Sequence, residues 1–257
     1  FIVSGRGIEA NPAKIRALSQ LDTPKDLKQI QKLTGCMAAL SRFISRLGEK
    51  ALPLYRLLRR TDHFGWTDAA TAGLEEIKAI LATNPVLAAP NTGEPMLLYI
   101  TATHQVVSAV LVVEQEADGH KFPLQKPVYY VSTVLTPCKS RYPHYQKIAY
   151  TVFMASRKLR HYFQECSITV ASEVPLNDII NNRDAMGRIA KWAIELLPFD
   201  ITYKPRRAIK SQVLADFIAE WTKAEVPKEY DAYSNWIMHF DGSKMLAGLG
   251  TGVVLMS

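Results

Sequence analysis

Cysteine is scarce in this chain of 257 residues, and long apolar runs are missing. The three cysteines, Cys36, Cys138 and Cys166, are odd in number and lack paired ligand spacing, so neither a disulfide framework nor a zinc site is indicated. No apolar run approaches the roughly 18 residues of a membrane span, and the first residues, FIVSGRG, lack the regions of a signal peptide. We therefore expect a soluble, intracellular protein in a reducing compartment, with no membrane partner.

Acidic residues are scarce in the first 60 positions, which hold 12 Lys and Arg against 4 Asp and Glu. The whole chain has a net charge of +7, so this part, at +8, holds all of the positive excess and the remaining residues are close to neutral. A local excess of cations is the expected footprint of phosphate contacts, because each Lys or Arg that neutralises a phosphate releases a condensed counterion. The alternative is an ordinary solvated helix surface.

The N-terminal part reads as a short strand pair followed by helices. The expected elements are a strand, turn and strand over Phe1 to Ile8, a helix from Thr23 and Pro24 to Ala39, a helical run over Leu40 to Arg60 interrupted at Gly48 and Pro53, and a helix over Asp68 to Ala82. The segment from Asn84 to Pro95 holds three prolines and a glycine and is therefore expected to be a linker.

The remaining elements follow in the order three strands, helix, strand, helices, strand, helix. The expected strands are Met96 to Thr103, Gln105 to Gln115, Lys126 to Thr133, Ser167 to Ala171 and Asp200 to Lys204. The expected helices are Arg141 to Phe163, Pro175 to Asn181, a helix through Ile189 and Leu196, and Gln212 to Trp221. This order predicts the α/β ribonuclease H (RNase H) fold, a mixed five-stranded sheet with flanking helices.

Three dispersed motifs resemble the RNase H region of gypsy-type LTR retrotransposon Pol polyproteins, which directly follows reverse transcriptase. They are YPHYQKIAYTVFMASRKLRHYF (Tyr142 to Phe163), RIAKWAIELLPFDITYKP (Arg188 to Pro205) and QVLADFIAE (Gln212 to Glu220). The chain also lacks an initiator methionine, and we expect it to be a piece of a longer polyprotein. In this family the Asp pair of the polymerase lies upstream, outside this chain.

The resemblance implies six consecutive regions. They are the end of a reverse-transcriptase palm (1–22), a mainly helical thumb-like region (23–83), a linker (84–95), an RNase H-like domain of connection type (96–222), a second linker (223–235) and the truncated start of a second RNase H domain (236–257).

The nuclease chemistry of the family needs four carboxylates, because two Mg²⁺ ions about 4 Å apart must be held by hard oxygen ligands. Carried over position by position, the family pattern places Thr101, Ile148 and Ser172 where the first three carboxylates belong, and it retains only Asp216. One carboxylate leaves most of the dehydration cost of two divalent ions uncompensated. We therefore expect a degenerate site that binds no metal and does not cleave, although Mg²⁺ is the cofactor of the parent family.

Two residues allow other interpretations of this site. A one-residue slip at the end of the fourth strand would place Glu173, in place of Ser172, at a ligand position. Asp216 can equally be a solvated or capping acid of the last helix. A rearranged site built from Asp216, Glu173 and Asp241 would make the chain an active hybrid-specific ribonuclease.

The last 22 residues read as a strand, a Gly-rich turn and a second strand, and they include the run His239 to Ser243 (HFDGS). This run resembles the opening of another RNase H domain, with Asp241 as its first metal-binding carboxylate. Two tandem modules, the first inactive, are a feature of plant gypsy-type elements. The alternative is an ordinary hairpin with a surface Asp.

The basic N-terminal region resembles the thumb of these polymerases, which implies backbone contacts to a template–primer duplex or an RNA–DNA hybrid. The candidate residues are Lys28, Lys32, Arg42, Arg46, Arg56, Arg59 and Arg60. Such contacts would position the duplex without reading its sequence. The expected function is to bind and orient hybrid beside the rest of the polyprotein, in a cytoplasmic virus-like particle or the nucleus; the remaining alternative is a decayed or host-recruited protein-interaction module.

Overall fold

The computed structural model describes residues 1–58, 64–116, 123–182 and 187–206, together with the backbone of residues 237–245 and 248–256. The chain divides into two compact units, Phe1–Phe217 and Ile218–Ser257, and each is described by itself. Within the described ranges, every helix is too short or too polar to cross a membrane.

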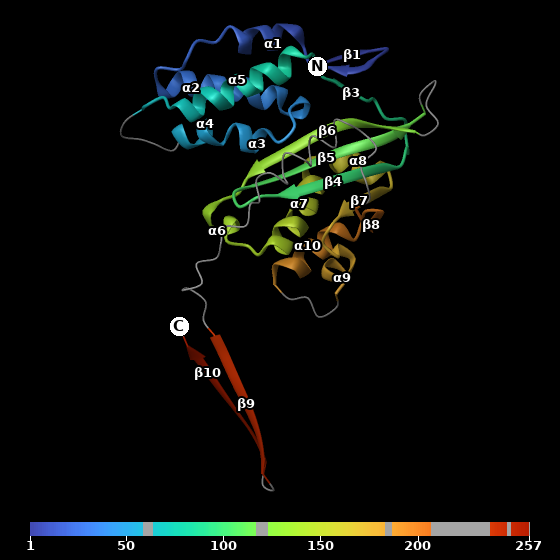
Figure 1. Cartoon of the computed structure of the whole chain (residues 1–257). Coiled ribbons are helices and arrows are strands. Elements are labelled where there is room, and N and C mark those ends of the chain that lie inside the picture. Colours follow the sequence, from blue (N-terminus) through green and yellow to red (C-terminus); the bar gives the residue numbers. More distant parts are fainter. Residues whose placement is uncertain (59–63, 117–122, 183–186, 207–236, 246–247, 257) are drawn as a thin grey trace. The chain divides into compact units, whose positions relative to one another are not determined.

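The first unit begins with a small antiparallel sheet and a layer of helices (Figure 1). The sheet has the order β1 (Ile2–Ser4), β2 (Gly7–Glu9) and β3 (Val86–Leu87). The helices are α1 (Pro12–Ser19), α2 (Leu27–Leu40), the 3-10 turn η1 (Ser41–Phe43), α3 (Leu47–Lys50), α4 (Leu52–Leu57) and α5 (Asp68–Ala82). The predicted strand pair at the N-terminus is confirmed, and the segment predicted as a linker contributes β3 to the same sheet.

Helix α2 begins three residues later than the sequence predicted, so the proposed start at Thr23 and Pro24 is wrong. Asp26 caps the helix instead, because its side chain accepts a hydrogen bond from Gln29 N at 2.8 Å. The Gln29 side chain in turn accepts from Lys25 N at 2.9 Å. These two bonds satisfy backbone donors at the helix start, as a capping box does.

The interruptions predicted at Gly48 and Pro53 also lie elsewhere. Gly48 is inside α3, and Pro53 is in the first turn of α4, where proline is tolerated. The chain turns instead at Arg46, whose φ of 52° is left-handed, and at Ala51 between the two helices. Gly48 is needed for close packing, because a Cβ there would lie 2.6 Å from Ser132 Oγ.

The centre of the unit is a mixed five-stranded sheet with the strand order β6-β5-β4-β7-β8. The strands are β4 (Met96–Ala102), β5 (Val106–Gln115), β6 (Leu124–Val134), β7 (Ile168–Ser172) and β8 (Ile201–Pro205). The first three pair antiparallel, whereas β4, β7 and β8 run parallel. This confirms the predicted mixed five-stranded, RNase H-like sheet.

Helices cover this sheet on the side away from α3 (Figure 1). They are α7 (His144–Lys158), α8 (Arg160–Glu165), α9 (Leu176–Ile180) and α10 (Arg188–Leu196), whereas the short helix α6 (Pro137–Ser140) follows β6 at one end of the sheet. The single helix predicted over Arg141 to Phe163 is two helices, because the backbone leaves the helical region at Leu159 (φ −113°, ψ 31°). Helix α7 packs on β4 and β5, and Trp192 of α10 stacks on Phe153 of α7, so these elements share one core.

The second unit is described as a backbone hairpin of β9 (Ile237–Met245) and β10 (Gly248–Met256). The hairpin confirms the two strands expected in the last 22 residues. The helix expected over Gln212 to Trp221 lies outside the described residues.

The glycines of α2 and α5 give a test of this packing. A Cβ on Gly73 of α5 would lie 2.4 Å from the carbonyl oxygen of Lys50, whereas a Cβ on Gly35 of α2 would meet nothing within 4 Å. We expect Gly73→Ala to lower the free energy of unfolding by about 1–3 kcal/mol through overpacking. The same change at Gly35 should raise it by about 0.5–1 kcal/mol because alanine favours a helix. Urea unfolding measures both, and equal effects at the two positions would contradict the packing of α5 on α3.

Candidate nuclease site and nucleic-acid interface

The mapped nuclease positions lie in three neighbouring elements, β4, α7 and the end of β7. Because β4 and β7 run parallel with Tyr99 opposite Ala171, Thr101 and Ser172 lie towards the same end of two neighbouring strands. Ile148 lies in α7, which packs on β4. The side chains are buried, with 2%, 2% and 6% of the surface exposed for Thr101, Ile148 and Ser172. The fold therefore presents the family's site region, but with neutral, buried side chains.

The environments of these three residues differ. Ile148 belongs to the apolar core together with Ile100 and Ala102. Thr101 alternates with those two residues along β4, so its side chain points to the opposite face of the sheet. Ser172 makes a local hydrogen bond, because its Oγ accepts from Val174 N at 3.0 Å. None of the three side chains can supply a carboxylate oxygen to a metal ion.

Thr101 begins a row of hydroxyl groups that crosses three strands. It lies opposite Ser108 of β5, which lies opposite Ser132 of β6. The two serine hydroxyls are 2.9 Å apart, and Ser132 Oγ also accepts from Gly48 N of α3 at 2.9 Å. Thr101 Oγ1 is buried and has no hydrogen-bond partner among the described residues. The face that carries Thr101 is thus the face on which α3 packs.

A buried cation stands beside the mapped Glu position. Lys147 precedes Ile148 on α7, is 7% exposed and donates from Nζ to the carbonyl oxygen of His104 at 3.1 Å. Burial lowers the pKa of this ammonium group. Sequence reasoning missed Lys147, although its place one residue before Ile148 was visible in the motif. A positive charge here opposes the binding of divalent cations.

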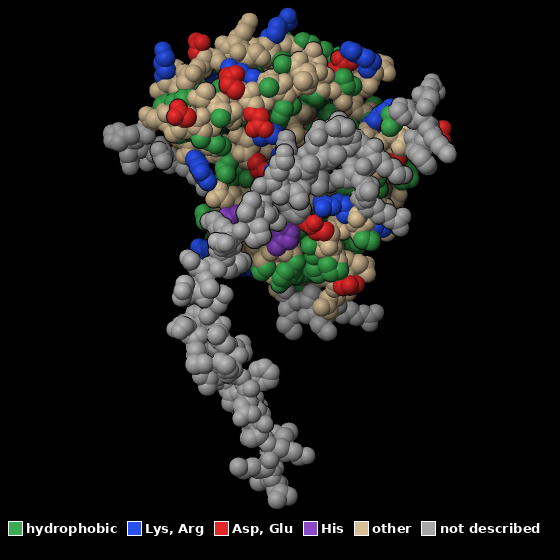
Figure 2. Space-filling view, viewed as in Figure 1, with side chains coloured by type: hydrophobic (Ala, Val, Ile, Leu, Met, Phe, Trp, Pro, Cys, Tyr) green, Lys and Arg blue, Asp and Glu red, His purple; other side chains and the backbone are tan. Residues whose placement is uncertain are grey.

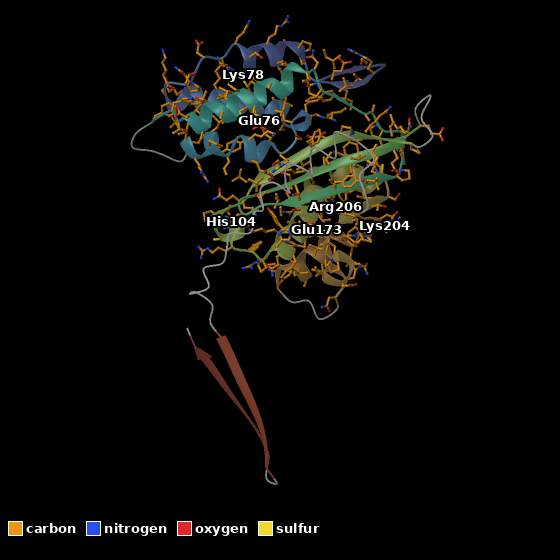
Figure 3. The ribbon with its side chains drawn as sticks, viewed as in Figure 1. Glu76, Lys78, His104, Glu173, Lys204 and Arg206 are labelled. Atoms are coloured by element: carbon orange, nitrogen blue, oxygen red, sulfur yellow. The ribbon has the colours of Figure 1, made fainter. Side chains whose placement is uncertain are left out.

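Glu173, the alternative ligand, interacts with basic side chains (Figure 3). Its carboxylate lies 3.2 Å from Arg206 Nη2 and 3.9 Å from His144 Nε2. Among the described residues, no group of three or more His, Cys, Asp or Glu side chains could hold a metal ion. The described part of the mapped site therefore does not fit a Mg²⁺ pair.

The structure describes no side-chain position for Asp216 or Asp241, the two candidate acids. Asp216 lies outside the described residues. Asp241 lies in β9, opposite Gly252 of β10, in a hairpin described by its backbone. The roles proposed for both acids stay predictions.

The candidate phosphate contacts that the structure describes fall into two groups, exposed residues and arginines that make internal contacts. Figure 2 shows Lys and Arg side chains over the helical layer, interspersed with acidic ones. Lys28 and Lys32 are exposed and lie one turn apart on α2, whose apolar stripe faces the core. Arg56 is exposed, and its guanidinium donates to Gln105 Oε1 at 2.7 Å. Arg59 and Arg60 lie outside the described residues.

Arg42 and Arg46 make internal contacts in this structure. The Arg42 guanidinium carbon lies 4.6 Å from the ring centroid of Tyr129 and 4.9 Å from that of Phe1. Arg46 is 6% exposed and pairs with Glu49. Arg42 therefore joins distant segments of the unit, and Arg46 is engaged by a nearby acid. Lys28 and Lys32 are better placed for phosphates.

The sequence and the fold are similar to reverse-transcriptase polyproteins. Residues 66–170 match the family described as the RNase H-like domain found in reverse transcriptase. The chain is 26% identical over 234 residues to the retrovirus-related Pol polyprotein from transposon opus of Drosophila melanogaster, covering 85% of this chain and 22% of that protein. It is 25% identical over 250 residues to the transposon Tf2-3 polyprotein of Schizosaccharomyces pombe, covering 92% and 18%. The chain thus spans about a fifth of the length of these relatives.

Two solved structures share the fold. One is the foamy viral protease-reverse transcriptase dRH in complex with double-stranded DNA, at 20% identity and a TM-score of 0.65, covering 81% of this chain and 37% of that chain. The other is the foamy viral protease-reverse transcriptase in complex with RNA/DNA hybrid, at 18% identity and a TM-score of 0.66, covering 98% and 34%. Together with the family match, the relatives support the predicted similarity to a retrotransposon Pol polyprotein with an RNase H-like reverse-transcriptase domain. They do not confirm the predicted gypsy type or plant lineage.

Restoring the first carboxylate tests the degenerate site. Thr101→Asp should lower the free energy of unfolding by about 3 kcal/mol or more, because it buries an unpaired charge. Thr101→Val keeps the shape and removes a hydroxyl that has no described partner, so it should change stability by less than about 1 kcal/mol. Denaturant unfolding at neutral pH, with and without Mg²⁺, measures both. Recovery of Thr101→Asp in Mg²⁺ would show that a metal site forms there.

Proposed function

We propose that this chain is a segment of a retrotransposon reverse-transcriptase polyprotein that binds and positions RNA–DNA hybrid, with phosphate contacts from its basic N-terminal helices, beside an RNase H-like domain that does not cleave the hybrid. The observation that carries the proposal is that Thr101, Ile148 and Ser172, at the positions where the family resemblance places three carboxylates, are buried and uncharged. Two Mg²⁺ ions need several anionic oxygen ligands, and none of these side chains supplies one. The fold of the nuclease is kept, whereas its chemistry is lost.

Retention of the fold favours a role in binding. A domain that no longer cuts can still present a surface to the A-form duplex, which proteins recognise by shape and by phosphate and 2′-hydroxyl contacts. The fold is shared with a foamy viral protease-reverse transcriptase in complex with RNA/DNA hybrid. We take that complex as support for hybrid as the partner of this chain, with the remainder of the polyprotein alongside it.

The phosphate contacts are assigned first to Lys28 and Lys32. Both are exposed on α2, and neither makes an ion pair with a described acid. By contrast, Arg46 and Lys50 pair with Glu49 and Glu76, which reduces their value as free counterions for a nucleic acid. A Lys or Arg without an acidic neighbour can contact a phosphate without first breaking an ion pair. Such residues therefore contribute most to salt-dependent binding.

A finer assignment is a gypsy-type element of the plant lineage with tandem RNase H modules. It is supported by the run from His239 to Ser243 and by the β9–β10 hairpin in which it lies. In this proposal Asp241 begins the second, cutting module, and Mg²⁺ belongs to that module. The polyprotein would act in a cytoplasmic virus-like particle or in the nucleus.

A double substitution, Lys28→Gln with Lys32→Gln, tests the binding surface. We expect the affinity for a labelled RNA–DNA hybrid to fall, and the slope of log K against log salt to become shallower by roughly 1 per lysine. Fluorescence anisotropy between 50 and 300 mM salt would measure both quantities, at about the concentrations where such contacts differ most.

The matched control is Lys191→Gln with Lys204→Gln, which removes the same charge from exposed positions on α10 and β8. The control should bind hybrid with nearly the parent salt slope. If the chain shows no saturable hybrid binding at low salt, or if both double variants change the slope equally, the proposed interface is wrong.

A further inference from the structure

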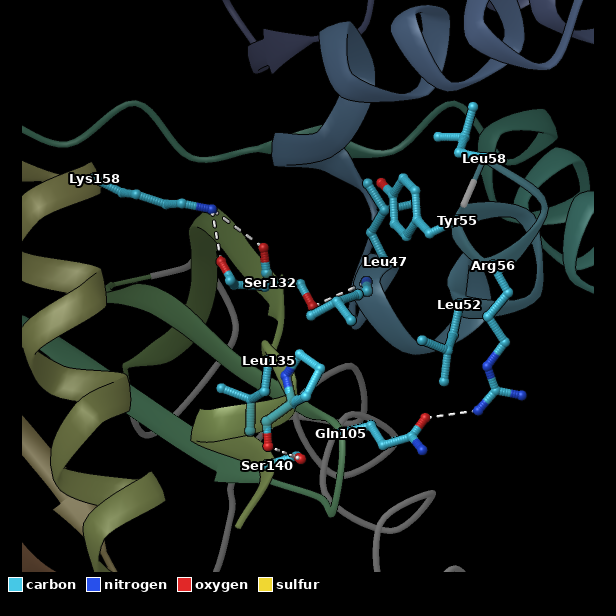
Figure 4. A pocket seen from close by; sticks show the side chains of 14 residues that line it. Leu47, Leu52, Tyr55, Arg56, Leu58, Gln105, Ser132, Leu135, Ser140 and Lys158 are labelled. Atoms are coloured by element: carbon cyan, nitrogen blue, oxygen red, sulfur yellow. Dashed lines mark hydrogen bonds between the residues drawn. The ribbon is translucent and has the colours of Figure 1, made fainter. Parts of the chain in front are cut away.

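A pocket of about 690 Å³ lies where α3 and α4 meet the end of β6 (Figure 4). This volume is within the range of roughly 300–1,000 Å³ that is usual for small-molecule sites. Apolar side chains, including Leu47, Leu52 and Leu135, form much of its wall, and the Tyr55 ring adds a flat surface. The pocket is separate from the mapped nuclease positions, because Thr101, Ile148 and Ser172 do not line it.

The charged residues that line the pocket are both cations, Arg56 and Lys158, and its lining includes no Asp or Glu. Figure 4 shows them on opposite sides of the pocket. Neither makes an ion pair with an acid among the described residues. The pocket therefore has a positive charge that nothing in the described chain neutralises, which favours an anion inside it.

Both cations are held by hydrogen bonds, and each retains N–H groups that can donate to a ligand. Lys158 Nζ donates to the carbonyl oxygen of Ser132 at 3.2 Å and to Thr133 Oγ1 at 2.9 Å, which uses two of its three N–H groups. Arg56 uses one of five N–H donors on Gln105 Oε1. A side chain that is already held by hydrogen bonds loses little conformational freedom when an anion binds. The entropic cost of binding the anion is therefore smaller than for a mobile side chain.

We infer that this pocket binds a small organic anion with a flat, ring-sized apolar body, held between the leucine wall and a fixed cation. The ring would pack on Leu47, Leu52 and Tyr55, and the anionic group would accept hydrogen bonds from Lys158 or Arg56. A mononucleotide and an aromatic carboxylate share this chemistry. Because the pocket is lined by α3, α4 and β6 together, the ligand would also tie the helical layer to the sheet.

Two fluorescent probes of similar shape test the inference without any nucleic acid. The anion 8-anilinonaphthalene-1-sulfonate should bind the folded chain at one site, and the neutral N-phenyl-1-naphthylamine should bind more weakly. We expect Lys158→Gln and Arg56→Gln to weaken binding of the anionic probe, at least one of them by about tenfold, as expected for loss of one charged hydrogen bond. Binding of the neutral probe should change less than about twofold.

Arg160→Gln is the matched control, because it removes the same charge from an exposed position of α8 that does not line the pocket. Circular dichroism confirms that each variant is folded. Displacement of the anionic probe by adenosine monophosphate identifies a nucleotide site, and displacement by 2-naphthoate alone identifies a site for aromatic acids. If Lys158→Gln and Arg56→Gln both behave like the control, or if neither competitor displaces the probe, the inference is wrong.

Discussion

The close approach of α3 to β6 is the contact on which much of the first unit depends. Gly48 N donates to Ser132 Oγ at 2.9 Å, and a side chain at Gly48 would collide with the same oxygen. Ser132 in turn bonds Ser108, which lies opposite Thr101. Thr101, the residue mapped to the family's first carboxylate, therefore belongs to a row of small hydroxyls on the sheet face that packs against α3. Small neutral groups suit this packed face, whereas a carboxylate would be buried without a partner.

The electrostatics of the region agree with this packing. A working two-metal site concentrates negative charge, but Ile148 is part of the apolar core and Lys147 beside it is a buried cation. Glu173, the nearest described acid to Ser172 along the chain, lies beside Arg206 and His144. Thr101, Ile148 and Ser172 supply no anionic oxygen, and the charge of Lys147 opposes a divalent cation. In the proposed function, the exposed lysines of α2 supply the contacts to nucleic acid.

The sequence predicted the strands of the sheet well, because uninterrupted apolar runs such as Ala109 to Val113 leave little choice. It predicted helix starts less well. The Asp26 cap with Gln29 was present in the sequence, but the Thr-Pro pair before it offered an equally familiar signal. The internal roles of Arg42 and Arg46 could not be predicted, because Arg42 contacts Tyr129, which is far away in the chain. The pocket depends on the same long-range packing, so neither Arg56 with Gln105 nor Lys158 with Ser132 was visible from sequence spacing.

Cleavage of the RNA strand in a labelled RNA–DNA hybrid tests the central claim most directly. The folded chain would be incubated with hybrid in Mg²⁺ and in Mn²⁺, beside an Asp216→Asn variant, at a protein concentration where hybrid is bound. A domain that positions hybrid leaves the RNA intact in every reaction, with binding unchanged by the metal. Divalent-dependent cleavage that disappears in Asp216→Asn would contradict this conclusion and show that an active site is built from residues beyond Thr101, Ile148 and Ser172.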